Sequence, residues 1–199
     1  SRGLVGSEMC IRDRSEIAQG EVLQLQHNKE IDILEETYLN IISSKTASLF
    51  AAATKVGAII AEKDLKYKNA LEFYGKNLGL TFQIADDTLD YNSELKLFGK
   101  NIGNDFYEGK VTLPIILLYQ KVDKFEKEKL KSFFEKDIRE KQDLEHVLVL
   151  IKKNNIINEC YKKAEHYINL ASNSLSVFEE SEEKNILKNL TSFSIERNF

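Results

Sequence analysis

The chain has 199 residues, of which 42% are hydrophobic, and its formal net charge at pH 7 is −4. This length suffices for one domain with a sizeable core, and the mild acidity argues against nucleic acid as a partner. Two cysteines give no disulfide framework, which suits a reducing, cytoplasmic location. With one proline, nine glycines and no alternating strand pattern, the sequence predicts an all-α protein.

Residues 1–14 do not fit the pattern of the rest of the chain. They have little periodicity, and they hold its only methionine and one of its two cysteines. They resemble the translated adaptor sequence that contaminates some assembled metagenomic reads, and their apolar segment is inadequate for a signal peptide. We therefore expect residues 1–14 to be non-native and to pack poorly, and residues 15–199 to be a portion of one domain.

Two helical patterns follow. The first is short, covers residues 15–27 and contains Gly20-Glu21, and the second reads as one long helix over residues 30–62. The predicted apolar stripe of the long helix consists of Tyr38, Ile41, Ile42, Leu49, Ala52, Ala53, Val56 and Ile60. Lys45 falls on that stripe, so it needs either an anionic partner or a route to water. The charged and hydroxyl side chains of this run favour a core helix over a transmembrane segment.

The next helix, predicted over residues 68–91, carries the acidic motif Phe82-Gln83-Ile84-Ala85-Asp86-Asp87-Thr88-Leu89-Asp90 near its C-terminal end. Asp86 and Asp90 lie one turn apart on one face, and Asp87 lies beside Asp90. Carboxylates at this spacing repel one another, so a helix that only packs would not favour them. They suit Mg²⁺, which binds through one or two carboxylates, water and substrate phosphate. The alternative is a solvated acidic patch.

Residues 99–110 form a glycine-rich segment that contains Lys100 and Lys110. A segment that returns two ammonium groups to a carboxylate cluster suits a polyanion held by metal on one side and by lysine on the other. The alternative is an ordinary surface connection. Earlier in the chain, Gly75 and Gly79 are spaced for close contact between helices.

The remaining sequence predicts further helices. Thr112 and Pro114 indicate the start of an apolar helix. Amphipathic helices follow, with breaks near Asp137, Asn154 and Glu180, and we expect their charges to be solvated. The three histidines share no metal-ligand spacing, which indicates structural or surface roles.

Together these motifs resemble the C-terminal part of the trans-isoprenyl diphosphate synthases, the polyprenyl synthetase family. The resemblance covers nearly all of residues 15–199. It rests on the acidic motif, the Lys45-Thr46 pair, and Gly99-Lys100-Asn101-Ile102-Gly103 followed by Asp105 and Gly109-Lys110-Val111-Thr112-Leu113-Pro114. It implies an antiparallel helical bundle of the isoprenoid synthase type, lacking its N-terminal helices, and a homodimer in the full-length parent. The implied reaction is head-to-tail condensation of isopentenyl diphosphate with an allylic diphosphate.

The resemblance also implies roles for particular residues, with Mg²⁺ as the cofactor. The metal ligands are Asp86, as the principal one, with Asp87 and Asp90 as direct or water-mediated support. The catalytic residues that contact the diphosphate or assist the developing charge are Lys45, Thr46, Gln83 and Lys100, and Lys110 is a further diphosphate-binding residue. A carboxylate cannot bind a diphosphate directly, so a divalent metal must lie between them.

Two features depart from the family pattern. Asn104 stands where many relatives have aspartate, and the family's first Asp-rich motif has no counterpart in this sequence. We therefore expect a prenyltransferase fragment that is inactive by itself. A non-catalytic regulatory subunit is the alternative, although the intact acidic and lysine residues argue against it. A terpene cyclase or head-to-head synthase is disfavoured by the Gly-Lys segment, and a purely structural bundle would leave Lys45 facing only solvent.

Overall fold

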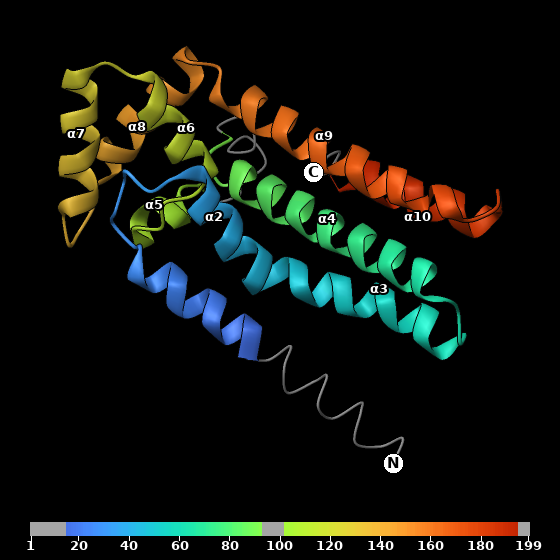
Figure 1. Cartoon of the computed structure of the whole chain (residues 1–199). Coiled ribbons are helices and arrows are strands. Elements are labelled where there is room, and N and C mark those ends of the chain that lie inside the picture. Colours follow the sequence, from blue (N-terminus) through green and yellow to red (C-terminus); the bar gives the residue numbers. More distant parts are fainter. Residues whose placement is uncertain (1–14, 93–101, 195–199) are drawn as a thin grey trace.

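The computed structural model describes residues 15–92 and 102–194, which form helices joined by turns and short loops (Figure 1). No strand occurs in these two ranges, in agreement with the all-α prediction. The expected packing of residues 1–14 and the placement of Lys100 lie outside the described residues.

The first half of the described chain is built from long helices. A helix over residues 15–26 precedes α2 (Glu35–Ile42). The π-helical segment η1 (Ser43–Ala47) leads directly into α3 (Ser48–Ile60). A short turn then reverses the chain into α4 (Leu65–Leu89), which agrees with the predicted acidic helix to within a few residues. The single regular helix predicted over 30–62 is wrong in two respects: it begins at Glu35, and η1 interrupts it.

The π-helical segment explains why half of the predicted apolar stripe is wrong. The stripe residues of α2 are buried, but beyond η1 Leu49 is 53% and Ile60 77% exposed. A π turn contains about one residue more than an α turn, so the following side chains are rotated by about 100°. Ala47, Ala51 and Ala58 are buried in place of the predicted residues.

Two glycines of α4 allow the end of η1 and the start of α3 to approach closely, as their spacing predicted. A Cβ atom on Gly79 would lie 2.6 Å from the Cα atom of Ala47, and one on Gly75 would overlap the Phe50 carbonyl. The Thr54 hydroxyl donates a hydrogen bond of 2.6 Å to the carbonyl of Leu71 across the same contact. The seam between α3 and α4 is therefore formed by small residues and backbone.

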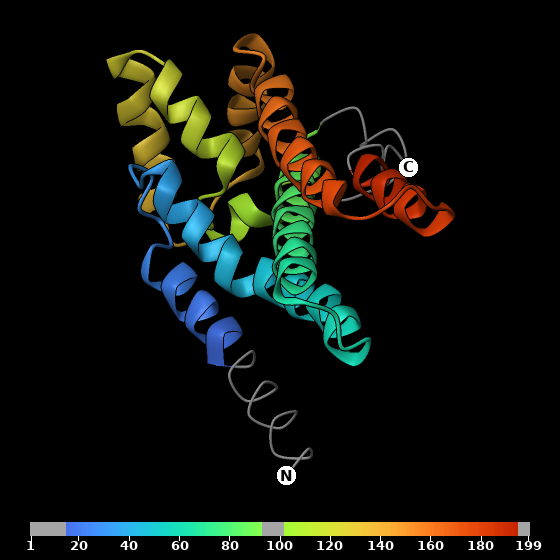
Figure 2. The same cartoon turned by 45° about the vertical axis from the view of Figure 1, so that its right-hand side comes forward.

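On its other side α4 packs along α9 (Ile156–Ser174) (Figures 1 and 2). Tyr74 and Leu78 meet Ala171 near one end. Farther along, the Thr81 hydroxyl lies 3.4 Å from the carbonyl oxygen of Ala164. The two helices are therefore antiparallel, and α4 lies between α3 and α9.

Cys160 is a fully buried, free thiol of α9. Burial raises its pKa to about 12, while a hydrogen bond with Thr88 acts in the opposite direction. Its sulfur thus lies in the contact between α9 and the acidic end of α4.

The other elements complete the bundle. They are α5 (Asn104–Glu108), α6 (Leu113–Lys121), α7 (Lys124–Glu135), α8 (Lys141–Lys153), η3 (Leu175–Val177) and α10 (Glu182–Phe193). α6 begins after Thr112 with Pro114 in its first turn, as predicted, although the Thr112 side chain makes no capping hydrogen bond. The three predicted breaks coincide with the ends of α7, α8 and η3. Among the described residues, no helix combines the length and apolar character that a membrane span requires.

The expectation of solvated charges in the C-terminal helices has three exceptions. Arg139, Asp143 and Lys184 are buried. Lys184 donates to the Phe178 carbonyl, and Asp143 accepts from Lys136. Buried charges persist only where such partners replace water.

Candidate active site

The acidic motif occupies the last turns of α4, and its three aspartates have different surroundings. Asp86 is exposed, and among the described residues its carboxylate makes no hydrogen bond or ion pair. Asp87 is only 5% exposed. Asp90 is the C-cap residue of α4 and is half-buried. Asp86 is therefore the carboxylate whose oxygens are open to a ligand.

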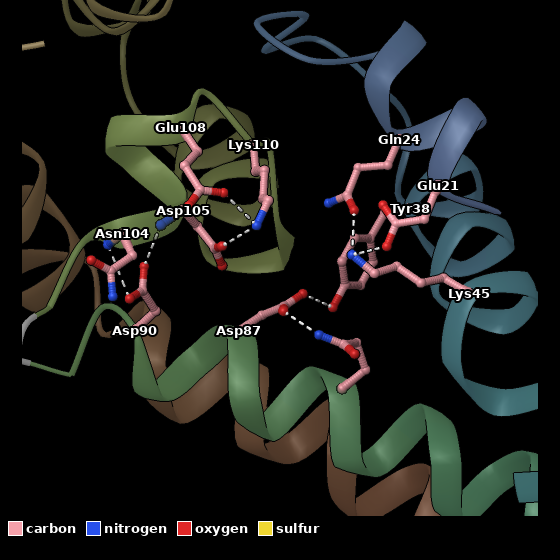
Figure 3. Close-up of polar contacts among 11 residues, drawn as sticks. Glu21, Gln24, Tyr38, Lys45, Asp87, Asp90, Asn104, Asp105, Glu108 and Lys110 are labelled. Atoms are coloured by element: carbon pink, nitrogen blue, oxygen red, sulfur yellow. Dashed lines mark hydrogen bonds and ion pairs between the residues drawn. The ribbon is translucent and has the colours of Figure 1, made fainter. Parts of the chain in front are cut away.

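Asp87 is the centre of a partly buried chain of hydrogen bonds (Figure 3). Its two oxygens accept from the Tyr38 hydroxyl and from Nε2 of Gln83, each at 2.7 Å. Oε1 of Gln83 accepts in turn from the Thr46 hydroxyl at 2.8 Å. The chain joins α2, η1 and α4, and it fixes the orientation of both Gln83 and Thr46.

The protonation of this network follows from its burial. Burial raises the pKa of the Asp87 carboxyl to about 7 and the charge of Asp105 adds to the shift, whereas hydrogen bonds from Tyr38 and Gln83 oppose it. Burial also raises the pKa of the Tyr38 phenol, so Tyr38 remains a donor at neutral pH. A bound divalent cation would favour the ionised form of Asp87.

Lys45 lies in the middle of η1, and its ammonium group contacts the helix over residues 15–26. Nζ lies 2.7 Å from Oε1 of Gln24 and 3.0 Å from Oε1 of Glu21. Gly20 permits this contact, because a Cβ atom there would lie 2.9 Å from the Cα atom of Lys45. Glu21 is therefore an anionic partner of Lys45, which is the first of the two alternatives that the sequence left open for this lysine.

Asp90 holds the start of α5. Its carboxylate oxygens accept the backbone N–H groups of Asn104 at 3.1 Å and Asp105 at 2.9 Å, and its carbonyl accepts from Gly103 at 2.8 Å. Burial raises the pKa of Asp90, and these N–H groups act against that shift. The contact uses the backbone of Asn104, so asparagine at this position does not weaken it.

Lys110 lies just beyond the other end of α5. Its Nζ atom is 2.7 Å from Glu108 Oε2 and 3.3 Å from Asp105 Oδ1. Burial alone would lower the pKa of Lys110, but the hydrogen bond to Glu108 and the charge of Asp105 raise it. Burial raises the pKa of Asp105, and Lys110 opposes that shift. Lys110 is thus a fixed cation beside a second carboxylate.

In Figure 3 the ammonium groups of Lys110 and Lys45 both lie above the acidic end of α4, to the left and to the right of the Asp87 carboxylate. They approach the acidic end of α4 from different elements, one from η1 and the other from the segment after α5. Fixed ammonium groups that flank a carboxylate suit an anion that is bound together with a divalent metal. Lys100, the other predicted lysine, lies outside the described residues.

The donor set fits a metal that is shared with a ligand. Within residues 15–92 and 102–194, no three His, Cys, Asp or Glu side chains are arranged to hold a metal ion by themselves. Mg²⁺ at this end of α4 would take Asp86 as its protein ligand and fill its shell with water and phosphate oxygens, as it does in many sites. Because hydrogen bonds already use the oxygens of Asp87 and Asp90, water-mediated support fits these two better than direct ligation.

Two members of the site were missed as functional residues in the sequence. Tyr38 was assigned to the apolar stripe, and only its contact with Asp87, 49 residues away, gives the hydroxyl a role. Asp105 was named only as part of the motif that carries the resemblance, with no role of its own, and the structure places it in the first turn of α5.

Comparison with known proteins gives consistent matches. The family described as Polyprenyl synthetase matches residues 7–151. The chain is 37% identical over 182 residues to an all-trans-nonaprenyl-diphosphate synthase (geranyl-diphosphate specific) of Rhodobacter capsulatus, covering 92% of this chain and 55% of that protein. It is 33% identical over 184 residues to a geranylgeranyl diphosphate synthase of Saccharolobus solfataricus, with 91% and 55% coverage.

Solved structures of related proteins also superpose closely on this chain. A decaprenyl diphosphate synthase from Rhodobacter capsulatus superposes with a TM-score of 0.90 at 36% identity, over 96% of this chain and 59% of that one. A polyprenyl synthase from Caulobacter crescentus, complexed with calcium and isoprenyl diphosphate, gives 0.90 at 36%, with 96% and 58% coverage. The chain thus spans little more than half the length of the relatives it matches.

Proposed function

The chain belongs to the polyprenyl synthetase family, and from this premise we propose that it is part of a prenyl diphosphate synthase. The proposed reaction condenses isopentenyl diphosphate with an allylic diphosphate, with Mg²⁺ as the cofactor. The observation that carries the proposal is the pair of ammonium groups, Lys45 and Lys110, that flank the acidic end of α4.

Each residue has a role that follows from its contacts. Asp86 would hold Mg²⁺, which would supply positive charge to the diphosphate and to the pyrophosphate as it departs. Lys45, Lys100 and Lys110 supply fixed positive charge for the same group. Gln83 and Thr46 are held by the Asp87 network and orient the diphosphate.

Three further properties are part of the proposal. The chain contains one Asp-rich motif of this kind, and we propose that it does not turn over substrates by itself. The complete enzyme is a cytoplasmic homodimer. The exposed apolar side chains on α3, among them Leu49 and Ile60, support burial of this face in a larger assembly.

The diphosphate site can be tested on this chain directly. Titration calorimetry with inorganic pyrophosphate should detect binding in the presence of Mg²⁺ and none with excess EDTA. Asp86→Asn should weaken binding by at least about tenfold, because it removes the open carboxylate. The Asp86 side chain is exposed and makes no hydrogen bond or ion pair among the described residues, so the thermal midpoint should hardly change.

A matched control lies at the other end of the same helix. Asp64→Asn makes the same change of charge at an exposed residue whose side chain makes no capping hydrogen bond, and it should leave binding unchanged. Equal losses of pyrophosphate affinity in the two variants, or binding that persists in excess EDTA, would overturn the proposed site.

The predicted inactivity of this chain is checked by incubation with Mg²⁺, farnesyl diphosphate and labelled isopentenyl diphosphate. Substantial turnover would contradict the prediction.

A further inference from the structure

The short helix α5 carries Asp105 and leads directly into Lys110, so whatever holds α5 determines where that ammonium group lies. A helix of five residues is far too short to be stable by itself. Its flanking residues, Gly103 at φ 82° and Gly109 at φ 77°, both have the left-handed conformation, so the chain turns sharply on either side. α5 therefore depends on contacts from other elements.

The two ends of α5 are held by opposite charges. At the N-terminal end, Asp90 accepts two backbone N–H groups. At the C-terminal end, Nη1 of Arg139 donates to the carbonyl of Tyr107 at 3.2 Å, and its Nη2 donates to the carbonyl of Phe134 at 2.6 Å. An anion at the start and a cation at the end of a helix both complement its dipole.

Arg139 is unusual for an arginine because it is almost completely buried, with only 6% of its surface exposed. Its guanidinium lies over the rings of Phe106 and Phe134, at 5.9 and 5.3 Å from their centroids. No described carboxylate lies within ion-pair distance of it. A buried cation with no carboxylate in direct contact is costly, so the carbonyls and rings around it, together with the charges of Asp137 and Asp143, must offset that cost.

Gly109 makes the approach of Arg139 possible. A Cβ atom on Gly109 would lie 2.8 Å from Nη2 of Arg139. The planar guanidinium reaches a carbonyl on α5 and another on α7 while it stacks on the two rings, which a lysine ammonium cannot do. The residue next in sequence to Gly109 is Lys110.

We propose that Arg139 is a positioning residue for diphosphate binding: it fixes the C-terminal end of α5 and thereby the ammonium group of Lys110. This inference rests on the proposed function. It assigns to the loop between α7 and α8 a part in the site, although Arg139 itself touches no ligand.

The test combines two substitutions. Arg139→Lys keeps the charge and loses the double contact, and we expect it to weaken Mg²⁺-dependent binding of inorganic pyrophosphate about tenfold, or about 1.4 kcal/mol. In a chain that already carries Lys110→Met, the same change should have no further effect, because the positioned group is gone. Lys141→Leu, at a side chain that is 76% exposed close to Arg139 in sequence, is the control and should leave affinity unchanged.

A purely structural role predicts a different result. It would lower affinity by the same factor in both backgrounds, and this additivity would overturn the inference, as would unchanged affinity in Arg139→Lys. Hydrogen exchange of the amides of residues 102–110 should also be faster in Arg139→Lys, with other helices unchanged; protection equal to that of the parent chain would overturn the inference even if binding falls. Absence of Mg²⁺-dependent binding in the parent chain would overturn the proposed function and this inference together.

Discussion

At the scale of single residues, the site depends on a carboxyl group that is almost fully buried. Asp87 has donors on both oxygens, yet its pKa is raised to about 7 by burial first and by Asp105 second. Neutral Asp87 is thus accessible near physiological pH in the absence of metal. The network that orients Gln83 and Thr46 is therefore sensitive to pH.

Substitution of Asp87 by asparagine should change how stability depends on pH. Because the folded state binds the Asp87 proton more tightly than the unfolded chain, with its ordinary pKa of 3.8, this residue stabilises the fold most at low pH. That contribution is lost as pH rises from about 4 to about 7. Between pH 5 and pH 8 the free energy of unfolding should fall by about 2–3 kcal/mol more in the parent chain than in Asp87→Asn.

Urea titrations in EDTA at several pH values measure this difference. The asparagine can keep both contacts, because the Tyr38 hydroxyl can rotate to accept from its amide. Asp90 and Asp105, whose pKa values are also raised, are present in both chains and largely cancel. Parallel stability curves for the two chains would mean that Asp87 is ionised in the folded state throughout this pH range.

Single residues also show which side chains sequence reasoning singles out and which it passes over. Lys45 and the acidic motif were recognised because their type conflicts with a helix that only packs. Tyr38 and Arg139 were not, because a tyrosine fits an apolar stripe and an arginine fits a solvated face. Their roles come from partners 49 and 32 residues away, a separation that periodicity does not reach.

At the scale of elements, helix type and most boundaries follow from the sequence. The breaks near Asp137, Asn154 and Glu180 are marked by polar residues between amphipathic patterns, and the structure has turns or loops there. The π-helical segment does not follow. The extra residue in a π turn leaves no mark in the composition of the sequence. In the structure it is visible because the buried positions of α3 are shifted from those of the predicted stripe.

The seam between α3 and α4 gives a direct test at this scale. Gly79→Ala should lower the free energy of unfolding by about 1–3 kcal/mol, because the added Cβ atom would meet the backbone of Ala47. Gly57→Ala, where a Cβ atom meets nothing within 4 Å, should instead raise it by up to about 1 kcal/mol. Thermal or urea unfolding of the two variants makes the comparison, and losses of similar size in both would argue against a tight seam.

At the scale of the whole molecule, α4 is the element around which the rest is arranged. It packs against α3 on one side and α9 on the other, and its C-terminal end carries the acidic motif. A bundle could be expected from the repeated amphipathic patterns, but which helices flank α4 could not. That choice depends on glycine contacts and on side chains such as Thr81, which meets Ala164 at a separation of 83 residues.

The buried thiol of Cys160 makes this arrangement measurable by chemistry. A sulfhydryl that is sealed between two helices and hard to ionise cannot react with an alkylating reagent until α9 parts from α4. In a chain with Cys10→Ser, modification should be very slow in buffer, and its rate should rise with urea in step with global unfolding. Rapid, urea-independent modification would mean that α9 separates from α4 locally, without global unfolding. The rate at which Cys160 is modified therefore reports how often α9 separates from α4, the two helices that support the acidic end of the bundle.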